Sequence, residues 1–171
     1  MSKGKMTVRR LSLIAVLITI LFVQEQLLTF IPNVQLTFLL LIVYSTTLPL
    51  GYNILIVIIH VLLDNLFMNS FQIQVLLPML IGYLPTILLG YLFKNKNEYM
   101  LAVIGVIGSI TYALSFALLN VLFFNTELIP YIIADIPFTI VLCMSSALSI
   151  LFLYKPIKKV IIDNLERFNL N

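Results

Sequence analysis

The sequence predicts an all-α integral membrane protein, a single bundle of six transmembrane helices. Of its 171 residues, 61% are hydrophobic and only 10% are charged, whereas soluble domains carry roughly a quarter charged residues. A chain of this size cannot hide so much apolar surface from water, so lipid is expected to be its solvent. The apolar residues also form long continuous runs instead of alternating with polar ones, which argues against strands.

Six apolar runs follow one another along the chain, and each is expected to form one helix. The first follows a basic tail over 1–9 and is too long for a signal peptide, and no small-residue cleavage site ends it, so it is expected to be retained. The second and third are short against the ~20 residues of a spanning helix, so tilt or local thinning of the bilayer is expected there. The predicted helices cover residues 10–30, 34–48, 52–68, 75–93, 99–124 and 131–154.

Residues 155–171 are expected to form a cytoplasmic amphipathic segment. Ile157, Val160, Ile161, Leu165 and Phe168 recur at helical spacing among charged residues. This pattern is typical of a helix on the lipid surface, although contact with a cytoplasmic partner subunit is an alternative. The two halves of the chain show no clear internal similarity, so residues 1–171 are expected to form one membrane domain.

The positive charges predict the orientation of the chain. All ten Lys and Arg residues lie in the two tails and in the loop between the fourth and fifth runs. With an even number of crossings these regions share one side, and cytoplasmic regions are the ones enriched in Lys and Arg. We therefore expect both termini in the cytoplasm. The basic residues flank apolar runs instead of forming a stripe, so no nucleic-acid binding is expected.

Polar residues interrupt the apolar runs mainly in the halves that this orientation places toward the outside. Charged and amide side chains are costly at such depths and usually mark a functional cavity. We therefore expect a solute-binding site open to the outside, although any single residue could instead bond a neighbouring helix. The candidates are Gln24, Glu25, His60, Asp64, Asn65, Asn120, Tyr131 and Asp135, and Gln26 is a further polar residue at this depth.

His60 and Asp64 are four residues apart and are expected to share one helix face. Such a pair suits a proton relay, part of a metal site or a set of solute ligands. A metal site is disfavoured, because the chain has one histidine and its single cysteine, Cys143, lies on a distant run. No nucleophile set, phosphate-binding loop or ATP-binding motif is present. The chain is therefore expected to be no enzyme and to hold no metal or cofactor of its own.

Small residues recur every three or four positions on three of the runs. Such faces let helices approach closely in lipid. On the fourth and fifth runs we expect them to serve packing inside the bundle, whereas the first run could offer its small face to another protein. The three sets are Ser12, Ala15 and Thr19; Gly82, Thr86 and Gly90; and Gly105, Ser109, Ala113 and Ala117.

Taken together, the basic N-terminal run ending in Ala15-x-x-x-Thr19, the segment Gln35-Leu36-Thr37 and the run from His60 to Asn65 resemble the substrate-binding (S) components of energy-coupling factor (ECF) transporters. The resemblance covers the whole chain in size and polarity. It implies a multi-pass protein of the plasma membrane that binds a vitamin with high affinity from outside. It also adds Gln35 to the expected solute-binding residues.

The resemblance implies partners as well. S components dock on a transmembrane T subunit through an Ala-x-x-x-Ala face of the first helix. Ala15 matches that pattern and Thr19 departs from it, so Ser12, Ala15 and Thr19 are the expected docking residues. Two cytoplasmic ATPase subunits hydrolyse the ATP, and the S component topples in the membrane to release its solute.

Three acids, one histidine and several amides favour a neutral or cationic solute. No Lys or Arg lies at that depth, which argues against folate or a phosphate ester, and the absence of tryptophan makes thiamine less suitable. A pyridoxine-type vitamin or cobalamin is the expectation. Two other classes stay open: a self-sufficient secondary transporter or channel acting as a homo-oligomer, with His60 and Asp64 as its ion relay, and a membrane scaffold without ligand.

Overall fold

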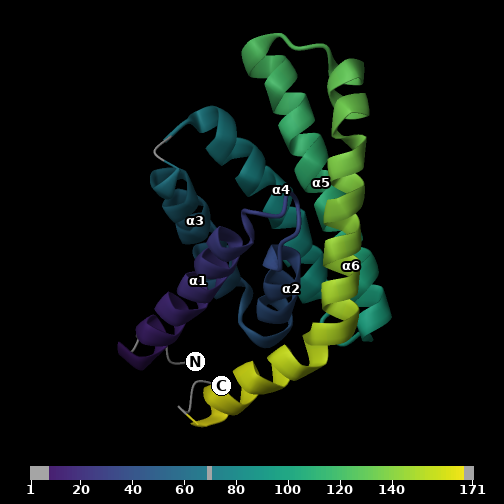
Figure 1. Ribbon diagram of the computed structural model, residues 1–171. Helices are drawn as coiled ribbons and strands as arrows, with labels where there is room; N and C mark the ends of the chain where they lie inside the picture. The colour runs from purple at the N-terminus through teal and green to yellow at the C-terminus, as the bar shows by residue number, and fades with distance from the viewer. Residues whose placement is uncertain (1–7, 69–70, 168–171) are drawn as a thin grey trace.

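A computed structural model describes residues 8–68 and 71–167, and within these ranges all regular secondary structure is helical (Figure 1). The all-α prediction is therefore confirmed for the described residues. The helices are α1 Val8–Leu28, α2 Thr37–Thr47, α3 Leu50–Phe67, α4 Ile73–Leu92, α5 Glu98–Phe124 and α6 Leu128–Arg167.

Five of the helices are long and apolar enough to cross a membrane, as expected of a multi-pass membrane protein. The exception is α2, which has 11 residues and therefore a length of about 16 Å, roughly half the thickness of a bilayer core. The predicted second helix over 34–48 was too long, because residues 34–36 belong to the connection from α1. Six helices are therefore present in the described residues, five of them long enough to span a bilayer and the second short, as its sequence indicated.

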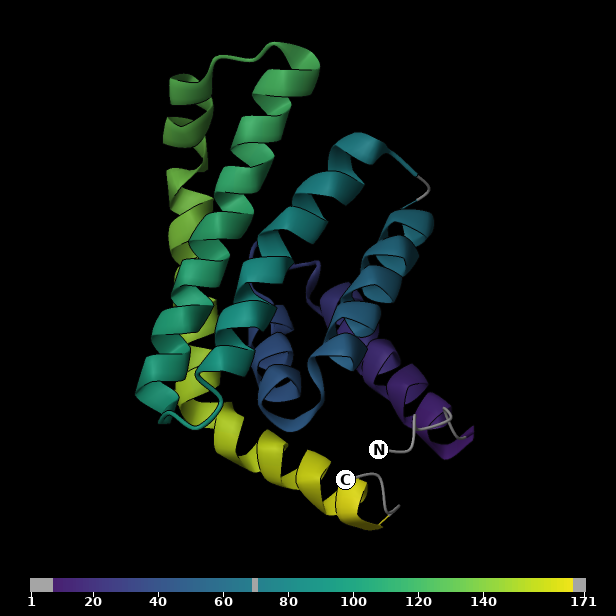
Figure 2. The same ribbon diagram turned by 180° about the vertical axis from the view of Figure 1, so that it is seen from behind.

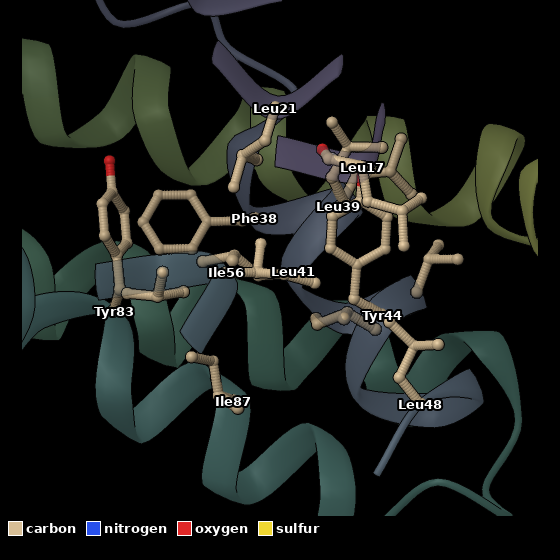
Figure 3. Packing of buried hydrophobic residues seen from close by; sticks show 14 of the residues in the cluster. Leu17, Leu21, Phe38, Leu39, Leu41, Tyr44, Leu48, Ile56, Tyr83 and Ile87 are labelled. Atoms are coloured by element: carbon tan, nitrogen blue, oxygen red, sulfur yellow. The ribbon is translucent and has the colours of Figure 1, made fainter. Parts of the chain in front are cut away.

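The short helix α2 forms the centre of the packing. Nine of its eleven residues are buried, and its side chains lie between those of α1 and α4, as Figure 3 shows for Phe38, Tyr44 and Tyr83. The phenol of Tyr44 donates a hydrogen bond of 3.0 Å to the carbonyl oxygen of Leu17 in α1. A helix that is apolar all round suits this position, since every face of it contacts protein.

The small residues of α4 and α5 serve contacts inside the bundle, as predicted. A Cβ atom on Gly82 would lie 2.7 Å from the Cα atom of Tyr112 in α5, and one on Gly90 would lie 3.0 Å from the Cβ atom of Ser45 in α2. Side chains larger than hydrogen would therefore push these helices apart.

The last helix corrects the prediction for the C-terminal segment. Instead of ending at Tyr154, α6 continues through Pro156 to Arg167, and its yellow C-terminal part turns beneath the bundle (Figures 1 and 2). Ile161 and Leu165 are buried against the protein, while Val160 is exposed. The apolar stripe thus packs partly on the bundle itself and not only on lipid, and Phe168 lies outside the described residues.

One end of the molecule gathers the described positive charges. The first turn of α1, the α4–α5 connection and the last turns of α6 lie at the same end, with the α3–α4 and α5–α6 connections at the opposite end (Figures 1 and 2). We call the first of these the basic end. Lys155 of α6 contacts Glu98 at the start of α5 there, with 2.6 Å between Nζ and Oε1.

Candidate functional site

The structure places most of the predicted site residues in two sets. Gln24 and Gln35 lie apart from both, at the connection between α1 and α2. The first set joins α1, α3 and α4, and we call it the buried polar group. The second set lines a pocket between α5 and α6, which we call the α5–α6 pocket. The buried polar group consists of Glu25, Gln26, His60, Asp64, Asn65 and Tyr83.

Two contacts join α1 to α3 inside the buried polar group. His60 Nε2 lies 3.0 Å from Glu25 Oε2, and the amide of Gln26 donates a hydrogen bond of 2.8 Å to Asp64 Oδ1. His60 and Asp64 are almost fully buried, and both face α1, which confirms that their i, i+4 spacing places them on one side of α3. Glu25 and Gln26 are adjacent on α1, and they contact His60 and Asp64, which lie one turn apart on α3.

Several polar atoms of this group remain without a hydrogen-bond partner among the described residues. They are Glu25 Oε2, both ring nitrogens of His60, Asn65 Oδ1 and the Tyr83 hydroxyl. The His60–Glu25 contact is close in distance but lacks the angles of a hydrogen bond, so both atoms keep bonding capacity. Unpaired buried polar atoms are rare in proteins and costly, at about 1–3 kcal/mol each. Their clustering leaves bonding capacity at one place for a further polar molecule, water included.

Two stacked tyrosines connect the buried polar group to the α5–α6 pocket. The ring of Tyr83 lies 6.1 Å from the imidazole of His60 and stacks on Tyr112 of α5 at 4.9 Å between centroids. Tyr112 in turn lines the α5–α6 pocket. Sequence reasoning missed both tyrosines, because a tyrosine within an apolar run resembles ordinary packing. The adjacent Gly82, which makes room for Tyr112, was the available signal.

The α5–α6 pocket has a volume of about 230 Å³. Tyr131 and Asp135 line it, as predicted, and Asn120 donates a hydrogen bond of 3.3 Å to the Tyr131 hydroxyl. Thr139, which the sequence reasoning overlooked, lies one turn after Asp135 and donates a hydrogen bond of 2.7 Å to its Oδ2. Asp135 is partly exposed, so its carboxylate stays accessible from the pocket.

Gln24 lies near the end of α1, and Gln35 lies in the connection between α1 and α2. The side chain of Gln24 donates to Thr37 Oγ1 at 2.8 Å and accepts from the backbone N–H of Leu36 at 2.9 Å. The backbone of Gln35 exchanges hydrogen bonds of 3.2 and 3.0 Å with the hydroxyl of Ser145 in α6. These contacts fix the connection beside α6. Both residues thus hold the polypeptide in place in this structure, whatever else they bind.

The expected docking residues lie on an open face of α1. Ser12, Ala15 and Thr19 are all exposed, and the two hydroxyls donate to carbonyl oxygens of their own helix, Ser12 to Val8 and Thr19 to Ala15. The polar atoms of Ser12 and Thr19 are thus satisfied within α1, and the face that they form with Ala15 is small and apolar, with the exposed side chain of Val16 beside it.

In the part of the chain that the structure describes, no three His, Cys, Asp or Glu side chains converge into a group that could hold a metal ion. The chain was compared with protein-family models, with curated proteins and with solved structures, and no match was found in any of the three.

Proposed function

We propose that this chain is the membrane-embedded solute-binding subunit of an ECF-type importer. In this role it takes up a water-soluble vitamin from outside the cell, at the end opposite the basic end. The basic end faces the cytoplasm, as the concentration of Lys and Arg there favours. The membrane would be the plasma membrane, with both termini inside.

The observation that carries the proposal is the cluster of unpaired buried atoms on Glu25, His60, Asn65 and Tyr83. A helix bundle that used these residues only as contacts between helices would gain by pairing each of them. Because these atoms have no partner among the described residues, they are available as donors and acceptors for a polar solute. Tyr112, which stacks on Tyr83 and lines the α5–α6 pocket, supplies flat apolar surface for a ring-containing solute.

The chemistry of both sets favours a neutral or cationic solute. Glu25, Asp64 and Asp135 supply carboxylates, and no Lys or Arg lines the α5–α6 pocket. The pocket, at about 230 Å³, is below the ~300–1,000 Å³ usual for drug-sized ligands. Of the two expected solutes, this volume favours the smaller, a pyridoxine-type vitamin, over cobalamin.

Helix α1 is the part of the chain proposed to contact the T subunit. The exposed small face of Ser12, Ala15 and Thr19 suits close approach by a helix of the T subunit. The chain carries no ATP-binding motif, which fits hydrolysis by two separate cytoplasmic ATPase subunits. A small face is also compatible with self-association, so docking needs its own test.

The binding test uses the hydroxyl of Tyr83. The first step is to identify small molecules released from the purified protein by mass spectrometry, and to measure the affinity of the released vitamin. Tyr83→Phe removes one unpaired hydroxyl with little change in shape, so it should weaken binding by roughly 0.5–1.5 kcal/mol and leave the unfolding midpoint unchanged or higher. The matched control is Tyr44→Phe, which loses the bond to Leu17 and should lower stability without touching affinity.

The outcomes separate the three classes of protein. Solute binding that Tyr83→Phe weakens, with uptake only after T and ATPase subunits and ATP are added, supports the proposal. Uptake into liposomes by this chain alone, driven by an ion gradient, would identify a secondary transporter with His60 and Asp64 as its relay. No released solute and unchanged behaviour of Tyr83→Phe would indicate a scaffold.

Docking is tested by substituting large side chains on the small face of α1. Ala15→Trp and Thr19→Trp should abolish co-purification with a T subunit while solute affinity stays the same, because a large side chain prevents close helix approach. Ala134→Trp, at an exposed position of α6, is the matched control and should still assemble. Survival of the complex in both α1 variants rules out this docking face.

A further inference from the structure

A separate cavity lies at the basic end, far from the residues proposed to bind the solute. Its volume is about 320 Å³, and α1, α2, α3, α4 and the C-terminal part of α6 all contribute to its wall. Arg10 and Lys94 supply two positive charges, Tyr52 and Tyr91 supply aromatic surface, and Leu165 of α6 contributes apolar surface. Segments from both ends of the sequence thus converge on one basic cavity.

The two cations of this cavity are not balanced by acids. No carboxylate of the described residues lies within ion-pair distance of Arg10 or Lys94, whereas Lys155 at the same end contacts Glu98 at 2.6 Å. No Asp or Glu lines the cavity. Two like charges around one confined space repel each other. An anion bound between them attracts both and offsets this electrostatic repulsion.

The donors present in the cavity suit phosphate oxygens in particular. A guanidinium offers paired N–H donors to two oxygens at once, and an ammonium adds a point charge. Lys94 Nζ lies 4.7 Å from the centre of the Tyr91 ring, a cation–π contact that holds the ammonium near the cavity. The hydroxyls of Thr46 and Thr47 also line the cavity, but they donate to carbonyl oxygens within α2. Arg10 and Lys94 therefore provide the charged donors.

The remaining wall is apolar. Leu13 and Ile14 of α1 and Leu48 beside Pro49 line the cavity together with Leu165. A free inorganic anion makes no use of such surface, whereas the glycerol and the first acyl carbons of a phospholipid do. Polar and apolar surface thus lie side by side in one cavity, as at a membrane interface.

We infer that the cavity at the basic end binds a phosphate-bearing anion through Arg10 and Lys94, while its apolar wall suits the glycerol and first acyl carbons of an anionic phospholipid. Because Leu165 closes one side, occupancy also ties the C-terminal part of α6 to α1 and α4. The site is independent of solute binding, so it stands whether or not the importer proposal is correct.

The test compares two double variants that remove the same charge from the same end. Arg10→Gln with Lys94→Gln changes the cavity, and Lys96→Gln with Lys159→Gln changes two exposed cations that do not line it. The full chain is purified in neutral detergent and titrated with phosphatidylglycerol and with phosphatidylcholine, and bound lipid is counted by native mass spectrometry. A single Lys94→Gln variant, at an exposed loop position, covers the case in which the double cavity variant fails to fold.

We expect the unmodified chain and the control to retain phosphatidylglycerol alike, and the cavity variant to bind it about tenfold more weakly, equivalent to about 1.4 kcal/mol. Phosphatidylglycerol that excess inorganic phosphate cannot displace identifies a lipid site. Displacement by inorganic phosphate, lost in the cavity variant, identifies a site for the free anion. Equal lipid and phosphate binding by the cavity variant, the control and the unmodified chain overturns the inference.

Discussion

The buried polar group and the α5–α6 pocket hold similar residue types but satisfy them differently. In the buried polar group, His60 is fully enclosed and both of its nitrogens lack a hydrogen-bond partner among the described residues. In the α5–α6 pocket, Asp135 is partly exposed and accepts a hydrogen bond from Thr139. Burial turns an unpaired polar atom into a cost in stability, whereas a partly exposed one can be solvated. Substitutions in the first region should therefore act on stability and binding together, and in the second on binding alone.

The largest effect is expected where a buried contact is broken. Glu25→Ala removes the carboxylate 3.0 Å from His60 Nε2 and leaves the imidazole without a polar neighbour on α1. Removing one partner of a buried polar contact leaves the other buried without it, which costs about 1–3 kcal/mol and more for a charged group. The thermal unfolding midpoint, followed by helical circular dichroism in detergent, should fall well below that of the unmodified chain. Glu25→Gln keeps the shape and a polar group and should lie between the two; an unchanged midpoint for Glu25→Ala would contradict a buried contact.

A smaller effect is expected at the junction of the two regions. Gly82→Ala places a Cβ atom 2.7 Å from the Cα atom of Tyr112, and backbone cannot move aside as a flexible side chain does. Overpacking of this kind costs about 1–3 kcal/mol, and it shifts the tyrosine that borders both regions, so solute affinity should fall with stability. The control is Gly51→Ala, where nothing lies within 4 Å of the new atom. That variant should be neutral or slightly more stable in the same unfolding assay, since alanine favours helix.

The smallest effect on stability is expected in the α5–α6 pocket. Asp135→Asn removes a charge but keeps an oxygen that can accept the hydrogen bond from Thr139. The free energy of unfolding of this variant should change by no more than about 0.5 kcal/mol. Its affinity for a cationic or hydroxylated solute should fall. Asp163→Asn, at an exposed position of the basic end, controls for net charge and should alter neither quantity. Equal affinity in both variants would exclude Asp135 from the solute site.

Much of the fold follows from local patterns that need no knowledge of neighbours. The continuous apolar runs predicted helices at the observed places, and the spacing of His60 and Asp64 predicted their common face, because both depend only on the geometry of one helix. The length of α2 could not be read in this way. Its first apolar residues are held outside the helix by the side chain of Gln24, which accepts the N–H of Leu36, and that contact joins two separate segments.

The continuation of α6 through Pro156 was also beyond local reasoning. Proline suits a helix start as well as a bend, so the sequence allowed a new helix or a bent one. Ile161 and Leu165 are buried against the rest of the protein, and this burial stabilises a helix that continues past Pro156. The packing partners of that stripe decided the outcome, and they come from other elements, such as Leu13 and Ile14 of α1, which line the same cavity as Leu165.

By itself, the sequence determined that this protein is helical, apolar enough for a membrane, and asymmetric in charge, because these properties are sums over single residues and single helices. It also identified most of the polar residues that interrupt the apolar runs. Only the tertiary structure decided that Glu25 meets His60, that Asp135 lies in a separate pocket, and that Tyr83 and Tyr112 connect the two regions. Pairing and burial depend on how helices cross, and helix crossing is set by close contacts such as that of Gly82 with Tyr112, which no single segment specifies.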